Sequence, residues 1–214
     1  MTALARLPHL PPMRRTILPA LLAAACFTAP AHAQATYYAQ VGLTGSSKIV
    51  RDVILTPVET RPGIAPTLFL GGELPIGPRY RMGLELSAAT ASLTTRTPAI
   101  PDSDLDQGRI TTIGAMLNLA GPVAPHLQWR GGIGLLRYNP SEQSGIFAQG
   151  GTTRALFGAG LDFRQPAGRR WDAMISARFD YHRFSTDELR HQGFTLQQGV
   201  RRLSVSVGLA RAAR

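Results

Sequence analysis

The stretch ALFGAGLDFRQPAGRRWDAMISARFDYHRF, residues 155–184, alternates between two kinds of residue on either side of a short turn. Every second residue from Ala155 to Phe163 is apolar, whereas Gly158, Gly160 and Asp162 fall between them. A period of two residues is the period of a β-strand, because successive side chains point to opposite faces. The stretch therefore predicts two strands, 155–164 and 170–184, joined by a tight turn.

The polarity of the two faces decides what kind of sheet this is. In the second strand the apolar face runs from Trp171 to Phe179, and the opposite face carries Asp172, Arg178 and Asp180. The glycines share the charged face, where a crowded interior needs small residues. This combination predicts a barrel with apolar side chains facing lipid and polar side chains filling a narrow lumen.

The first 33 residues predict secretion. Arg14 and Arg15 precede a short apolar segment, 17–27, and small residues flank His32. This pattern is typical of a signal peptide cut after residue 33, and the apolar run is too short for a spanning helix. A buried N-terminal helix and lipidation at Cys26 are the alternatives.

Charge and cysteine content narrow the kinds of site and partner that the protein could have. The chain has a formal net charge of +10 and one cysteine, Cys26, which cleavage would remove together with Arg6, Arg14 and Arg15. Residues 34–214 could then form neither a disulfide nor a thiolate metal site. A basic chain can indicate nucleic-acid binding, but these arginines are dispersed along strands of a secreted protein. They suit anionic lipid headgroups or sugar phosphates better.

The same alternation recurs along residues 34–214, which have the size of one domain. Eight strands are predicted at 36–44, 64–74, 79–93, 109–120, 124–138, 155–164, 170–184 and 194–209. Residues 49–50 and 53–55 indicate that strands extend beyond the membrane in the first long loop. Long and short connections alternate, so the fold class is an all-β, eight-stranded, antiparallel up-and-down transmembrane barrel. The first strand must pair with the last, because an open edge in hydrocarbon leaves backbone groups unpaired.

Eight strands enclose an interior that side chains just fill. The predicted lumen therefore holds a packed polar network made of the inward-facing charges, namely Arg81, Glu85, Arg130, Asp162, Arg178, Asp180 and Arg202. Mutual neutralisation is the structural interpretation of this set, and an ion-conducting path is the functional one. Aromatic girdles are expected from Tyr80, Phe163 and Trp171 at the short-turn end, and from Tyr138, Tyr181 and Phe184 at the outer end.

The segments GGIGLLRY (131–138) and SARFDYHRF (176–184), with the signal peptide and the strand pattern, resemble the small outer-membrane β-barrel-domain family of Gram-negative bacteria. The resemblance covers most of residues 34–210. It implies an outer-membrane location, contact with outer-membrane lipids and lipopolysaccharide, help from the barrel-insertion machinery, and a monomer without cofactor. Members of the family usually end on an aromatic residue, whereas this chain ends in ARAAR.

Some small barrels act on lipid A, and this chain has a few of the residues such an enzyme needs. His182, Ser185, Asp187 and Glu188 lie close together near the predicted outer rim. A hydrolase needs its histidine, hydroxyl and acid within hydrogen-bond reach of one another. The spacing of three residues places His182 and Ser185 on opposite faces of a strand, unlike the closer spacing of the lipid A deacylase family.

Other motifs are weak. Asp102, Asp104 and Asp106 could ligate calcium, but the calcium-hand glycine and later glutamate are missing, so a solvated acidic loop is the simpler interpretation. The glycine clusters 131–134 and 158–160 precede no helix and no Gly-Lys-Ser/Thr motif, so they are not phosphate loops. We therefore expect no catalytic, cofactor or metal residues and a structural or surface-binding role. A deacylase-like enzyme acting on lipid A and a small-solute pore stay open, whereas inward charges argue against a soluble ligand carrier.

Overall fold

The computed structural model describes residues 35–52, 58–96, 105–143, 145–191, 193 and 197–212. Its strands are β1 Thr36–Ser46, β2 Val50–Asp52, β3 Val58–Pro62, β4 Ala65–Pro75, β5 Arg81–Arg96, β6 Leu105–Ala124, β7 Leu127–Pro140, β8 Thr152–Pro166, β9 Trp171–Phe184 and β10 Gln198–Ala212. Two short helices, η1 Gly145–Phe147 and α2 Asp187–His191, lie in the connections. No helix within these ranges is long and apolar enough to cross a membrane. The predicted signal peptide and Phe194 lie outside the described residues.

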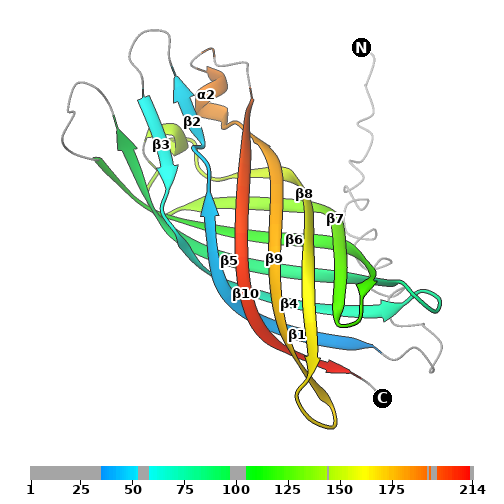
Figure 1. Ribbon diagram of the computed structural model, residues 1–214. Helices are drawn as coiled ribbons and strands as arrows, with labels where there is room; N and C mark the ends of the chain where they lie inside the picture. The colour runs from blue at the N-terminus through cyan, green and yellow to red at the C-terminus, as the bar shows by residue number, and fades with distance from the viewer. Residues whose placement is uncertain are drawn as a thin grey trace, which may run out of the picture. The chain divides into compact units, whose positions relative to one another are not determined.

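Eight antiparallel strands close into a barrel (Figure 1). Around the wall the order is β1, β4, β5, β6, β7, β8, β9 and β10, and β10 pairs back onto β1. The closing pair is long, since its register runs from Thr36 opposite Ala212 to Ser46 opposite Arg202. The expectation that the first strand pairs with the last is confirmed, and it leaves no open edge in the barrel wall.

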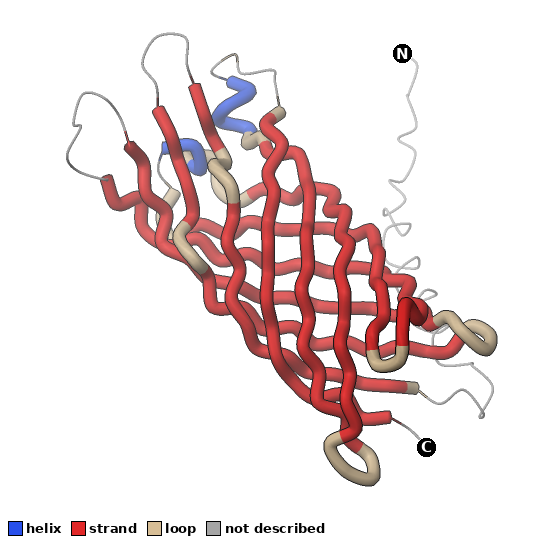
Figure 2. The backbone as a smooth tube through the Cα atoms, viewed as in Figure 1, coloured by secondary structure: helices blue, strands red, loops and turns tan. Residues whose placement is uncertain are grey.

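The connections differ sharply between the two ends of the barrel (Figure 2). At one end, here called the short-turn end, residues 76–80, 125–126 and 167–170 join β4 to β5, β6 to β7 and β8 to β9. The strands β1, β5, β7 and β9 end at the opposite end, here called the long-loop end, where the longer connections begin. The start of β1 and the end of β10 meet at the short-turn end, as their register requires. This is the alternation that the sequence predicts.

The first long connection contains a small hairpin made of β2 and β3. β3 pairs with the far end of β5, from Glu59 opposite Arg96 to Pro62 opposite Leu93, and β2 pairs with β3. The hairpin rises above the barrel at the long-loop end (Figure 1). Of the residues for which strands were predicted here, Val50 begins β2 and Ile49 lies just before it, whereas residues 53–55 lie outside the described part.

One predicted turn is displaced. The sequence analysis ends the fourth strand at Ala120, but β6 continues to Ala124. The pairing of β6 with β7 shifts register between Pro122 and Ala124, and this bulge accommodates a proline that cannot donate to the ladder. The chain then reverses at His126, which adopts a φ of 66°. The carbonyl oxygen of His126 accepts a hydrogen bond from the Arg164 amide at 2.8 Å.

The outward face of the barrel is apolar. Large apolar side chains stand exposed on every wall strand, for example Val41, Leu70, Leu86, Leu117, Ile133, Phe157, Ile175 and Val207. Between them the inward residues are buried, so exposure alternates along each strand. An exposed apolar belt of this extent is the outer surface of a transmembrane barrel rather than of a protein surrounded by water.

The prediction that Tyr138 and Phe184 belong to the outward aromatic girdle is wrong. Tyr138 is 2% exposed and Phe184 is 1% exposed, so both lie inside the lumen. Their position in the alternation explains this, because Tyr138 has the same parity as the buried Leu136 and Phe184 the same parity as the buried His182. The other girdle residues, Tyr80, Phe163, Trp171 and Tyr181, are exposed on the outward face.

Candidate functional site

The short-turn half of the lumen is organised around Arg130 on β7. Its Nη2 atom lies 2.6 Å from Glu73 Oε1 and 2.6 Å from Asp162 Oδ2. Its Nη1 atom donates to the hydroxyl of Tyr38 at 2.7 Å, and the guanidinium sits 4.9 Å from the centre of that ring. All four side chains are buried. Arg130 therefore ties together β1, β4, β7 and β8.

A second ion pair joins Arg178 on β9 to Glu85 on β5. The hydroxyl of Tyr38 donates to Glu85 Oε2 at 2.7 Å, which links this pair to the Arg130 cluster. Arg178 also donates to Gln40 Oε1 at 3.2 Å and stacks 4.4 Å from the centre of the Phe69 ring. Buried charges are tolerated when they are paired and hydrogen bonded in this way.

Glu73 is the carboxylate with the most cations around it. Besides Arg130, it accepts bonds from Arg164 Nη2 at 2.9 and 3.0 Å. Arg81 Nη1 lies 3.8 Å from Glu73 Oε2 and donates to Thr36 Oγ1 at 2.6 Å. Glu73 therefore anchors the charged cluster at the short-turn end of the lumen.

The structure places the predicted lumen charges as follows. Arg81, Glu85, Arg130, Asp162 and Arg178 belong to the connected cluster. Asp180 and Arg202 are also buried but lie nearer the long-loop end, opposite each other in the register of β9 and β10. Arg202 donates to Thr112 Oγ1 at 3.4 Å.

The sequence analysis left out several members of the cluster. Glu73 and Arg164 have the parity of the inward face, so extending the alternation by one step would have included both. Tyr38 and Gln40 are inward on β1, but nothing in their spacing indicates that they bridge separate ion pairs. Those roles depend on which strands lie across the lumen.

Packing in this half is tight. A cavity of about 10 Å³, the volume of roughly one water molecule, lies between Asn118, Arg130, Arg178 and Asp180. Met116 reaches the same place and would contact a Cβ added at Gly158 within 2.8 Å. The glycines of the inward face therefore make room for long side chains from the facing strands.

The long-loop half of the lumen also holds an apolar cluster, which the sequence analysis did not predict. Wall residues such as Ile110, Leu136, Leu156 and Val200 form one buried cluster with Ile49, Phe147 and Leu189. The last three come from the segment before β2, from η1 and from α2. Phe184 packs edge-on against Phe147 at 5.9 Å between ring centres. We call Ile49, Phe147 and Leu189 the apolar plug.

The residues of the deacylase-like alternative do not assemble among the described contacts. His182 is fully buried, and its Nε2 atom lies 2.6 Å from the hydroxyl of Tyr138. The Ser185 hydroxyl instead donates to the carbonyl of Thr186 at 3.4 Å. Asp187 pairs with Arg190 on the exposed side of α2.

No group of three metal-ligating side chains occurs in the described ranges. Of the acidic loop considered for calcium, Asp102 and Asp104 lie outside these ranges. Asp106 lies in β6, where it accepts a bond from the Gly108 amide at 2.8 Å.

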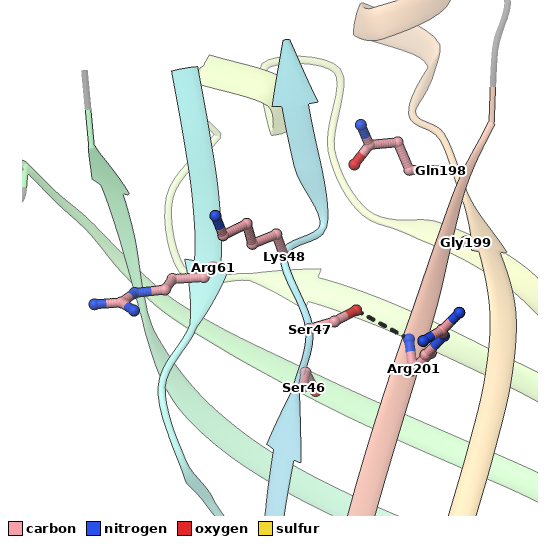
Figure 3. A pocket seen from close by; sticks show the side chains of 7 residues that line it. All are labelled: Ser46, Ser47, Lys48, Arg61, Gln198, Gly199 and Arg201. Carbon is pink, nitrogen blue, oxygen red and sulfur yellow. Dashed lines mark hydrogen bonds between the residues drawn. The ribbon is translucent and has the colours of Figure 1, made fainter. Parts of the chain in front are cut away.

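A cavity of about 690 Å³ opens at the long-loop end, and we call it the outer notch (Figure 3). It is lined by Ser46, Ser47, Lys48, Arg61, Gln198, Gly199 and Arg201. The barrel wall divides at this point, because β2 turns away from β10 to pair with β3. Two hydrogen bonds join the two sides just before the division. The Ser47 amide donates to the Arg201 carbonyl at 2.8 Å, and the Arg201 amide donates to Ser47 Oγ at 3.0 Å.

The outer notch is basic. Lys48 Nζ lies 2.5 Å from Glu59 Oε2, whereas Arg201 is exposed and has no carboxylate within ion-pair distance in the described part of the chain. Arg61 is exposed on the β3 side. In Figure 3 the side chain of Gln198 reaches from β10 into the gap between the two sides. Strand periodicity cannot reveal this site, because the notch exists only where the pairing divides.

Neither a protein-family model nor a curated protein matches this sequence. Among solved structures, the outer membrane protein OprG from Pseudomonas aeruginosa is 9% identical with a TM-score of 0.52, covering 84% of this chain and 95% of that chain. The outer membrane protein AlkL, solved in DMPC lipid bilayers, is 12% identical with a TM-score of 0.52, covering 86% and 92%. At such low identity the likeness concerns the fold. This chain shares the closed eight-stranded barrel of small outer-membrane proteins.

Proposed function

We propose that the protein is an outer-membrane barrel with a structural and surface-binding role, and that the outer notch binds phosphate groups of lipopolysaccharide. The observation that carries the proposal is the division of the wall between β2 and β10, which leaves an open basic cavity at the long-loop end. In barrels of this layout the long loops face the outside of the cell.

The position of Arg201 supports this ligand. Arg201 shares the outward face of β10 with Leu203, which is 61% exposed, and it follows the last apolar residue of the belt toward the long-loop end. Acyl chains would therefore cover Leu203, and lipid phosphates would lie at the height of Arg201. Guanidinium groups bind phosphate through charge-assisted hydrogen bonds, often two at once.

The lumen supports binding at the rim over passage through the barrel. Ion pairs centred on Arg130 fill the short-turn half, and the apolar plug covers the long-loop half. A pore would require both layers to rearrange. A structural and binding role needs neither to move.

The test compares variants of the notch with a matched arginine elsewhere. Arg61→Gln and Arg201→Gln remove cations from the notch, and Arg137→Gln removes an exposed arginine from the outward face of β7. Binding of purified lipopolysaccharide to the detergent-solubilised protein is measured by calorimetry, with dephosphorylated lipopolysaccharide alongside. Each notch variant is expected to bind about two- to fivefold more weakly, as for an exposed charge contact.

Arg137→Gln should bind like the original protein, and dephosphorylated lipopolysaccharide should no longer distinguish the notch variants from it. Equal affinity for all three variants would show that the notch does not hold the phosphates. Weakening by Arg137→Gln to the same degree would show attraction by overall charge alone.

A further inference from the structure

At the short-turn end, an arginine lies between two aromatic residues on the outward face. Arg211 on β10 is opposite Tyr37 on β1 and opposite Trp171 on β9, so the three side chains occupy one row across neighbouring strands. Tyr37 is 63% exposed and Trp171 is 46% exposed. Within the described residues no carboxylate lies within ion-pair distance of Arg211, which is itself exposed.

A groove of about 580 Å³ runs from this row toward the middle of the barrel wall. Its outward-facing lining, beyond Tyr37, Trp171 and Arg211, consists of Ala39, Val41, Leu68, Val207 and Leu209. Ala39 is the small residue between Tyr37 and Val41, and it faces Leu209 and Leu70 across the sheet. The short side chain leaves a depression between larger neighbours.

We infer that this groove binds one phospholipid of the periplasmic leaflet. The lipid phosphate would accept hydrogen bonds from Arg211, and one acyl chain would lie over Ala39. Two features of the row fit this ligand: a cation suits the phosphodiester, and the amphipathic rings of Trp171 and Tyr37 suit the level of the headgroups.

Charge and geometry together distinguish this site from the rest of the belt. Aromatic residues near strand ends are common to the whole interface, and by themselves they would contact any lipid. Here no carboxylate of the described residues pairs with the cation, and the groove continues directly beneath it. A phosphate with an attached acyl chain matches both features at once.

The direct test measures lipid retention by native mass spectrometry in detergent. The original protein is expected to retain one phosphatidylglycerol, and to retain diacylglycerol, which lacks the phosphate, about tenfold less. Arg211→Gln should weaken phosphatidylglycerol retention to a similar extent. Ala39→Leu should weaken it by filling the groove, whereas Ala115→Leu, an equivalent change on the outward face of β6, should leave retention unchanged.

A second measurement uses the folded chain with Trp129→Phe, which leaves Trp171 as the reporter. Brominated phosphatidylglycerol is expected to quench Trp171 fluorescence in a saturable manner at one lipid per protein. Non-saturable quenching, equal retention of diacylglycerol, or equal effects of Ala39→Leu and Ala115→Leu would each overturn the inference. Retention of lipid A that depends on Arg211 would overturn the choice of phospholipid. These results do not depend on lipopolysaccharide binding at the outer notch.

Discussion

Arg130 shows how single residues hold this barrel together. Its guanidinium contacts carboxylates from two strands and a hydroxyl from a third, all in a region that is closed to solvent. Alternation along β7 was enough to place Arg130 in the lumen. Its partners Glu73 and Tyr38 depend on how the strands are staggered around the wall, and one sequence does not determine that stagger.

Replacing Arg130 should therefore cost more than replacing any exposed arginine. Arg130→Leu leaves Asp162 and Glu73 without their nearest cation, and removing one partner of a buried ion pair typically costs about 3–5 kcal/mol. Because Arg164 still contacts Glu73, we expect a loss of about 3 kcal/mol in the free energy of unfolding. Urea titration of the protein in lipid vesicles measures it.

Arg137→Leu is the control for this change, since Arg137 is an exposed arginine on the same strand. Its effect should stay within about 0.5 kcal/mol. Equal unfolding midpoints for the two variants would show that the cluster around Arg130 contributes no stability.

The pair that closes the barrel leaves no room for a side chain at Gly208. A Cβ added at Gly208 on β10 would lie 2.0 Å from the carbonyl oxygen of Ala39 on β1. Gly208 has the parity of the buried Ser204 and Ser206, so it lies on the crowded inward face, where a glycine is needed. By contrast, the β2–β3 hairpin was expected only as scattered apolar residues, because its strands are short and β3 pairs with β5 beyond β4.

Gly208→Ala should disturb closure of the barrel. The added methyl group must displace backbone of β1, and overpacking of this kind costs about 1–3 kcal/mol. The fraction that migrates as folded protein on an unheated gel should fall after refolding. Gly45→Ala is the matched change, because a Cβ there meets nothing within 4 Å. If both variants refold equally well, the close approach at Gly208 does not limit closure.

For the whole molecule, period-two alternation determined most of the fold in advance. It predicted the strands, the apolar outer belt and the closure, because every wall residue must face either lipid or lumen. It did not predict the apolar plug, since Ile49, Phe147 and Leu189 come from connections whose positions follow from tertiary packing. The outer notch was missed for a similar reason, because it lies where strand pairing divides.

The central claim is that this barrel turns its apolar face outward, and β10 offers the most direct test. Single cysteines would be placed at positions 203 to 209 in a chain carrying Cys26→Ser, spin-labelled, and compared in lipid vesicles for accessibility to oxygen and to a water-soluble nickel complex. We predict high oxygen accessibility at Leu203, Val205, Val207 and Leu209, and low accessibility at the positions between them. The opposite phase, or an alternating response to nickel in place of oxygen, would contradict the inside-out barrel.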